Sequence, residues 1–117
     1  MRNVRVYLQS WYKQQALKVI KERVGHFSRI SGLEFKSLAI TSAETRWGSC
    51  SSDRNLNFNW KLIMAPQQVI DYVVAHELAH LVEMNHSRGF WEQVRKMFPM
   101  YREYRTWLKR HGDVLVI

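Results

Sequence analysis

The chain has 117 residues, of which 46% are hydrophobic and 24% are charged, and its formal net charge at pH 7 is +8. This length indicates a single domain over residues 1–117, and the balance of residue types excludes a disordered chain. The one cysteine, Cys50, cannot form an internal disulfide, and no stretch approaches the roughly 20 apolar residues of a membrane span. We therefore expect a cytoplasmic protein, from a reducing compartment, with no membrane partner.

The first predicted element is a long amphipathic helix that begins near residue 3. Its apolar residues recur every four positions, at Val4, Leu8, Tyr12, Ala16, Ile20 and Val24. The pattern continues past Gly25 to Gly32, a residue type suited to ending a helix. Because glycine costs about 1 kcal/mol in a helix interior, we expect a kink or a break at Gly25.

Three short strands are predicted next, because the apolar period changes from about four to two. The first follows Phe35, the second covers residues 46–51, and the third covers residues 55–60. Residues 52–54, Ser-Asp-Arg, predict a turn that joins the second strand to the third. Strands this short and this close together indicate a small, three-stranded, mostly antiparallel sheet.

Three helices are predicted after the strands. The first begins at Pro66 and is apolar on nearly all sides, which indicates a buried position. Ser87 can cap the second helix, Pro99 separates it from the third, and Gly112 ends the third. The fold class expected from this order is α+β, with a long N-terminal helix, a small sheet, a buried helix and two C-terminal helices.

The buried helix carries the segment HELAH, residues 76–80. His76 and His80 lie roughly 40° apart around the helix and about 6 Å apart along its axis, so both imidazoles can reach one metal ion. Glu77 projects beside them, where a carboxylate can accept a proton from a metal-bound water. Ionisable groups in an apolar helix need such a partner. The segment predicts a zinc site in which Glu77 activates a zinc-bound water.

A catalytic zinc ion usually has three protein ligands and a water molecule, so a third ligand is expected. His86 is the first candidate, provided that the chain leaves the helix after His80 and folds back. Met84-Asn85 offers this exit, because asparagine tolerates the left-handed conformation that ends helices. Glu92 and Glu103 are the alternative ligands.

Two runs of the sequence resemble the YgjP-like metallopeptidases. They are RWGSCSSDRNLNFNWKLIMAP, residues 46–66, and HELAHLVEMNHSRGFW, residues 76–91. The resemblance implies a zincin-like fold and Zn²⁺, and the convergence of the helix histidines on one ion predicts one Zn²⁺ per chain. It implies His76, His80 and His86 as metal ligands, with Glu77 as the catalytic residue. The implied activity is that of a metalloendopeptidase acting on a peptide or protein substrate.

Three smaller interpretations accompany this assignment. The segment RWGSC, residues 46–50, contains no metal-binding chemistry and is interpreted as strand packing, with Cys50 as a small hydrophobe. Phe90 and Trp91 are expected to pack beneath the metal site. The candidates for stabilising the charge that develops on the substrate are Tyr101, Arg102 and Tyr104.

The alternative function is that of a metal-dependent ribonuclease with a three-histidine site. Bacterial rRNA-maturation ribonucleases have the same histidine spacing, and the positive net charge would suit RNA. They carry glycine where this chain has Glu77, and the chain has no tight run of five or six basic residues. Nucleic-acid binding is therefore not favoured. A third interpretation is a zinc-stabilised binding module without catalytic activity. It is not favoured, because such a module does not need the carboxylate of Glu77 beside the metal.

The tail after Gly112, residues 113–117, is apolar and strand-prone. An exposed segment of this kind is expected to pair with another surface. It could pack on its own domain. It could also occupy the substrate groove of the same molecule or of a neighbouring copy, which would keep the enzyme latent and allow self-association.

Overall fold

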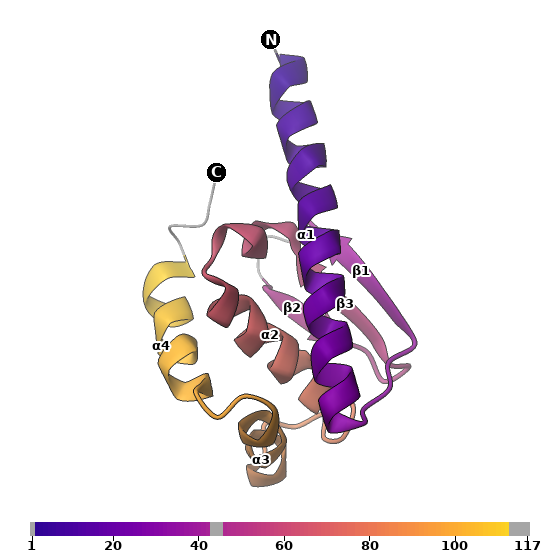
Figure 1. Ribbon diagram of the computed structural model, residues 1–117, viewed down its shortest axis with the longest axis vertical. Helices are drawn as coiled ribbons and strands as arrows, with labels where there is room; N and C mark the ends of the chain where they lie inside the picture. The colour runs from indigo at the N-terminus through magenta and orange to yellow at the C-terminus, as the bar shows by residue number, and fades with distance from the viewer. Residues whose placement is uncertain (1, 43–45, 113–117) are drawn as a thin grey trace.

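The computed structural model describes residues 2–42 and 46–112, and these residues form an α+β fold, as predicted (Figure 1). The elements in chain order are α1 (Arg2–Ser31), β1 (Ser37–Thr41), β2 (Gly48–Cys50), β3 (Asn55–Asn59), the 3₁₀ helix η1 (Trp60–Met64), α2 (Gln67–Ala79), α3 (Arg88–Met97) and α4 (Tyr101–His111). None of the helices in this part of the chain combines the length and the hydropathy needed to cross a membrane.

Helix α1 runs for 30 residues without the break that we expected at Gly25. Ala16, Ile20 and Val24 on its inner face are completely buried, and this packing outweighs the roughly 1 kcal/mol that a glycine costs within a helix. The helix ends as predicted. Gly32 adopts a φ of 75°, and its N–H donates to the Ser28 carbonyl at 2.9 Å. The N-terminal half of α1 extends well beyond the rest of the domain (Figure 1).

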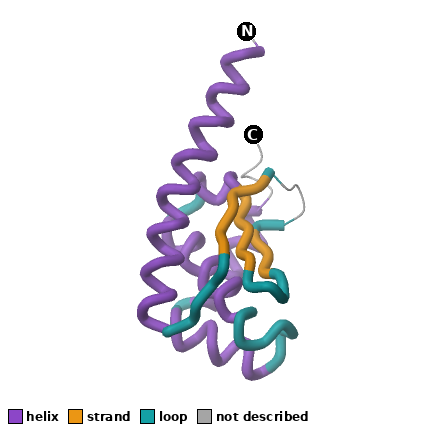
Figure 2. The backbone as a smooth tube through the Cα atoms, turned by 90° about the vertical axis from the view of Figure 1, so that its right-hand side faces the viewer, coloured by secondary structure: helices purple, strands orange, loops and turns teal. Residues whose placement is uncertain are grey.

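The sheet has the strand order β1-β3-β2, and its three strands run side by side (Figure 2). The β2–β3 pair is antiparallel, as expected for two strands joined by a short turn. The β1–β3 pair is parallel, so the sheet is mixed rather than mostly antiparallel. The parallel pairing of β1 with β3 follows from the order of the strands. Because β2 pairs with one edge of β3, β1 lies at the opposite edge, and the chain reverses direction twice between β1 and β3.

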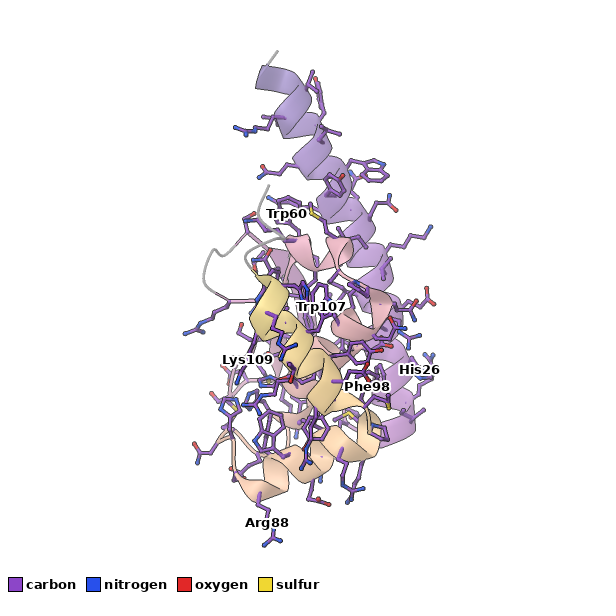
Figure 3. The ribbon with its side chains drawn as sticks, turned by 90° about the vertical axis from the view of Figure 1, so that its left-hand side faces the viewer. His26, Trp60, Arg88, Phe98, Trp107 and Lys109 are labelled. Atoms are coloured by element: carbon purple, nitrogen blue, oxygen red, sulfur yellow. The ribbon has the colours of Figure 1, made fainter. Side chains whose placement is uncertain are left out.

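Helix α2 lies at the centre of the molecule, in contact with α1, α3, α4 and β2 (Figure 1). Nearly all of its residues are buried, as its apolar sequence predicted. Its buried Asp71 accepts two hydrogen bonds from Arg23 of α1, Nε to Oδ1 at 2.7 Å and Nη2 to Oδ2 at 3.0 Å. On another side, Trp107 of α4 (labelled in Figure 3) packs against the small cluster formed by Ala65 and Val69. The centre of α2 is thereby fixed between helices and sheet, while its C-terminal end carries the predicted metal ligands.

Candidate metal centre

Helix α2 ends at Ala79, and a tight turn carries the chain back toward His86. The backbone N–H groups of Val82 and Glu83 both donate to the Ala79 carbonyl, at 3.0 and 3.1 Å. Our expectation of a left-handed exit at Met84-Asn85 is wrong, because Arg54 is the only non-glycine residue with a positive φ in the described part of the chain. The helix unwinds earlier because its last carbonyl accepts from two successive N–H groups of the turn.

The turn brings His86 to the two histidines of α2, as the spacing predicted. One ring nitrogen from each of His76, His80 and His86 lies within 4.8 Å of the others. The ring centroids form a nearly equilateral triangle with sides of 5.0 to 5.1 Å. Three imidazoles placed in this way can reach one ion after small side-chain rotations.

The two carboxylates considered as alternative ligands lie outside this cluster. Glu92 is exposed on α3 and accepts hydrogen bonds from Arg95 at 2.8 and 3.2 Å. These hydrogen bonds lower the pKa of Glu92. Glu103 is exposed in the first turn of α4. The described cluster of metal-ligating side chains contains the three histidines and neither glutamate.

The helix histidines have hydrogen-bond partners that leave one nitrogen free for a metal. His76 Nδ1 lies 3.2 Å from Oε2 of Glu77, and His80 Nδ1 lies 3.1 Å from the backbone oxygen of Glu83. Both neighbours are acceptors, so a proton on Nδ1 would satisfy them, and Nε2 of a neutral ring would then be available to a metal ion. Metal-binding histidines are typically held in this way, by a carboxylate or a carbonyl behind the ring.

Beneath the histidines lies an apolar floor. Phe90 is completely buried, and its ring centroid is 4.5 to 5.0 Å from those of the three histidines, as predicted. The ring of Trp91 stacks on those of His86 and Tyr101, with centroid distances of 6.1 and 5.5 Å. Burial, followed by the charges of the neighbouring histidines, lowers the pKa of His86, which favours the neutral imidazole that binds metals.

Glu77 is only 4% exposed, and strand β2 covers it closely. A Cβ atom added to Gly48 would lie 3.0 Å from both Cγ and Oε2 of Glu77, and 3.2 Å from Cγ1 of Val73. The RWGSC segment therefore does more than pack the sheet, because its glycine makes room for the predicted catalytic carboxylate. A glycine inside a short predicted strand was the available signal, since such a glycine often marks a close approach of another group.

Cys50 lies on the same strand and is partly buried. Burial, with a further contribution from the charge of Glu77, raises the pKa of its thiol. A thiol with a raised pKa is a poor nucleophile at neutral pH. The structure agrees with reading Cys50 as a packing residue.

The three candidates for charge stabilisation are placed differently. Tyr104 packs against Phe98, with ring centroids 5.8 Å apart, and belongs to the core. Tyr101 stacks on Trp91, and its hydroxyl accepts a hydrogen bond from Arg102 Nε at 3.2 Å. Tyr101 and Arg102 therefore border the site, whereas Tyr104 does not.

Sequence reasoning missed two further neighbours of the site. The ring of Tyr72 meets that of His76 edge-on at 5.9 Å, and burial is the main cause that raises the pKa of Tyr72 to about 12. The guanidinium of Arg105 lies over the ring of Trp91, 4.7 Å from its centroid. Tyr72 stands four residues before His76 on one helix, so the i, i+4 rule could have found it. Arg105 reaches the site only through packing between helices.

Comparison with known proteins assigns this arrangement to a family. The model of the family described as "YgjP-like, metallopeptidase domain" matches residues 1–111. The chain belongs to this family. No curated protein sequence matches the chain.

Two solved structures have the same fold as this YgjP-like domain. The metallopeptidase zymogen abylysin of Pyrococcus abyssi superposes with a TM-score of 0.69 at 21% identity, over 78% of this chain and 93% of that one. The metallopeptidase zymogen jannalysin of Methanocaldococcus jannaschii gives 0.68 at 20% identity, over 78% and 94%. The fold is zincin-like, as predicted.

Proposed function

We propose that this YgjP-like domain is a zinc-dependent endopeptidase in which His76, His80 and His86 hold one zinc ion per chain and Glu77 is the general base. The observation that supports the proposal is the convergence of three imidazoles beside a buried carboxylate, in a metallopeptidase domain. Three neutral imidazoles are a common zinc ligand set. They leave a fourth position open, as catalytic zinc sites do.

The zinc ion would supply a Lewis acid that polarises the scissile carbonyl and makes an attacking water more acidic. The remaining chemistry falls to Glu77. Its Oε2 is engaged by His76 Nδ1 at 3.2 Å, which leaves Oε1 to take a proton from the water and return it to the departing amine nitrogen. Because Glu77 is buried, its carboxylate acts in a medium where electrostatic interactions are stronger than in bulk water.

The outer edge of β2, the edge turned away from β3, is the proposed binding site for the peptide backbone. Trp47 and Ser51 are bonded to β3 through backbone hydrogen bonds of 2.9 and 3.0 Å. Because bonded residues alternate along an antiparallel pair, the backbone groups of Gly48 and Cys50 point away from β3. An extended peptide could pair with these groups as an added strand. Since Gly48 also touches Glu77, a peptide bound at this edge would pass the metal centre.

We also propose that the C-terminal tail can occupy this edge and keep the enzyme latent. Residues 113–117 lie outside the described residues. Gly112, just before them, is close to Trp47: a Cβ at Gly112 would lie 3.6 Å from Trp47 Cζ2. The described chain therefore ends close to the residue before β2, and abylysin and jannalysin are metallopeptidase zymogens. Deletion of residues 113–117 should raise peptide hydrolysis; unchanged activity together with unchanged mass in solution would argue against latency.

The decisive experiment combines metal analysis of the purified protein with parallel peptide and RNA cleavage assays. Glu77→Gln should retain zinc and lose hydrolysis by about 10²- to 10⁴-fold, the usual contribution of a general base. His80→Ala should lose the zinc. Glu103→Gln, which removes an exposed carboxylate of α4, is the matched control and should behave like the wild type.

Three results would count against the proposal. The first is stoichiometric zinc in the His76→Ala, His80→Ala double variant. The second is peptide cleavage by Glu77→Gln at the wild-type rate. The third is cleavage of RNA without cleavage of peptide, which would favour the ribonuclease alternative.

A further inference from the structure

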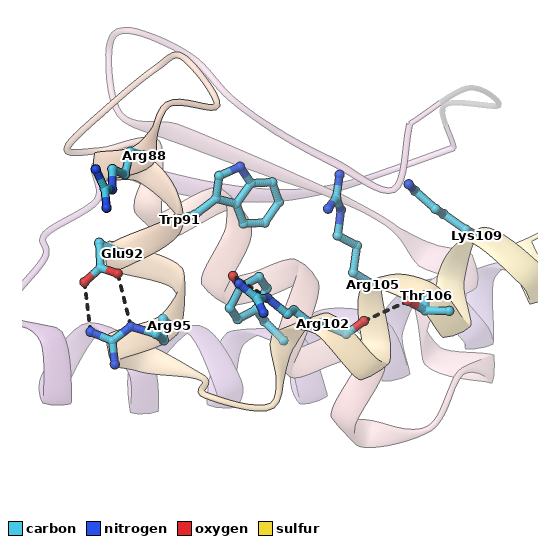
Figure 4. A pocket seen from close by; sticks show the side chains of 9 residues that line it. Arg88, Trp91, Glu92, Arg95, Arg102, Arg105, Thr106 and Lys109 are labelled. Atoms are coloured by element: carbon cyan, nitrogen blue, oxygen red, sulfur yellow. Dashed lines mark hydrogen bonds and ion pairs between the residues drawn. The ribbon is translucent and has the colours of Figure 1, made fainter.

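A basic cavity of about 670 Å³ lies beside the metal centre, between the facing sides of α3 and α4 (Figure 4). The charged residues that line it are Arg88, Glu92, Arg95, Arg102, Arg105 and Lys109. Figure 3 views the molecule from this side, with α4 in front and Arg88 at the lower end. A cavity of this size is within the roughly 300–1,000 Å³ range of ligand sites.

Most of the positive charge in this basic cavity is not neutralised by the protein. Arg95 forms an ion pair with Glu92 at 2.8 Å. The other four cations, one from the start of α3 and three from α4, form no ion pair with a described residue. Cations that line a concave surface without partners attract anionic ligands.

The basic cavity borders the metal centre at Trp91, which is the lining residue that also contacts the histidines. This residue lines the cavity, and its ring contacts those of His76 and His86 at 5.9 and 6.1 Å. A substrate residue next to the bond under attack could therefore place its side chain in the cavity.

Aromatic contacts hold two of the arginines in place. Arg105 lies over the Trp91 ring at 4.7 Å, and Arg102 donates from Nε to the Tyr101 hydroxyl at 3.2 Å. Neither contact uses all five N–H donors of a guanidinium, so both arginines can still bind a carboxylate through two parallel hydrogen bonds. Their positions are set before a ligand arrives, which lowers the entropy lost on binding.

We propose that the basic cavity binds a carboxylate of the substrate next to the scissile bond, so that the enzyme selects acidic peptides. This inference rests on the proposed peptidase function and names its substrate class. RNA is the less suitable anion, because single strands bind by stacking bases on free aromatic faces. Here Trp91 is stacked with Tyr101 and His86 and covered by Arg105, and Tyr101 is buried.

The test measures binding by the zinc-loaded Glu77→Gln protein, so that no peptide is consumed. Fluorescently labelled pentapeptides with a central Glu, Gln or Lys, each amidated at the C-terminus, are compared by fluorescence anisotropy. The Glu peptide should bind at least about tenfold more tightly than the Gln peptide, as expected for a charge-assisted bidentate pair. A Gln peptide with a free C-terminus shows whether the cavity takes a side-chain carboxylate or a terminal one.

Substitutions connect the preference to the cavity. In the Glu77→Gln background, Arg105→Gln should remove the preference for Glu, and Arg105→Glu should reverse it in favour of Lys. Arg102→Gln leaves the Trp91–Arg105 contact in place and should weaken Glu binding several-fold. Arg110→Gln removes an exposed arginine of α4 that does not line the cavity, and it should bind as the parent does.

Equal affinity for the Glu, Gln and Lys peptides, or a preference for Glu that survives both Arg105 substitutions, would overturn the proposal. So would Arg105-dependent binding of an RNA oligonucleotide by a protein that does not discriminate between the peptides. The proposed function can fail separately. A wild-type protein that prefers the Glu peptide but cleaves no peptide would refute the peptidase assignment and leave the carboxylate site in place.

Discussion

Gly48→Ala tests whether strand β2 sets the position of the carboxylate of Glu77, the proposed general base. The added methyl group would lie 3.0 Å from Cγ and Oε2 of Glu77 and 3.2 Å from Cγ1 of Val73. Optimal carbon–carbon separations are about 3.5–4.0 Å, so the carboxylate or the strand must move by roughly 0.5 Å. Glu77 has little freedom to turn aside, since it is buried and in contact with His76.

The expected loss of activity follows from this displacement. A misplacement of about 1 Å can cost about 10²-fold in rate, so roughly half of that should lower kcat about tenfold. Overpacking should also destabilise the fold by about 1–3 kcal/mol, partly offset by the lower entropy of an unfolded chain that contains alanine. The methyl group would meet Glu77 and Val73 and none of the proposed zinc ligands, so zinc content should be unchanged.

The assay compares kcat, zinc content and the urea unfolding midpoint of Gly48→Ala with those of Gly89→Ala. Gly89 lies in α3 close to the same site, but an added methyl group there would meet only Ser87 Oγ at 3.8 Å, an ordinary contact. Gly89→Ala should keep its activity and gain up to about 1 kcal/mol of stability from helix propensity. A Gly48→Ala protein with wild-type kcat would refute the idea that β2 positions Glu77.

Three further predictions concern the metal and the core. Free zinc at a hundredfold excess over its Kd should stabilise the folded protein by about 2.7 kcal/mol. Removing this zinc with EDTA should therefore lower Tm by roughly 10 °C. An unchanged melting curve would show that zinc does not bind preferentially to the folded state. His86→Ala should weaken zinc binding in a chelator competition by more than the roughly 10- to 100-fold cost of losing an outer partner, and Glu92→Ala should not. Asp71→Ala should lower the free energy of unfolding, measured in urea, by about 2–3 kcal/mol, because Arg23 then loses its part-buried partner. A change no larger than that caused by removing Glu92 from its exposed ion pair with Arg95 would contradict this.

The parts of the site that depend on helical periodicity could be predicted from the sequence. His76, Glu77 and His80 take their relative positions from the 3.6-residue repeat, so their geometry depended on one local prediction, that residues 66–80 form a helix. The return of His86 could be predicted because a third ligand was needed. The path of the chain between His80 and His86 could not be predicted. It depends on which carbonyls of α2 accept hydrogen bonds from the N–H groups that follow, and the conformational preference of asparagine is only a weak influence on that pattern.

Long-range pairings were much less accessible. A short turn predicts that β2 and β3 are antiparallel, but no local feature says whether the earlier strand β1 will add to the outer edge of β2 or to that of β3. The choice depends on which edge lets β1 cover the core beside α1. The same limit explains why the break expected at Gly25 is absent. The sequence shows the free-energy cost of a glycine within a helix, but it does not show the packing of α1 that outweighs this cost.

The basic cavity shows that positive charges can gather in the fold without forming a run in the sequence. Along the sequence the cations that line the cavity stand three, four or seven positions apart, so they form no run of five or six. On a helix, a spacing of three, four or seven places them on one face, and each face alone is an ordinary solvated surface. Two such faces opposed across a cavity bring the positive charges together, and the effective cluster arises only from packing. A charge pattern read with the period of the predicted helix would have marked both faces. It could not have shown that they meet beside the metal ligands, because that requires the crossing of α3 and α4.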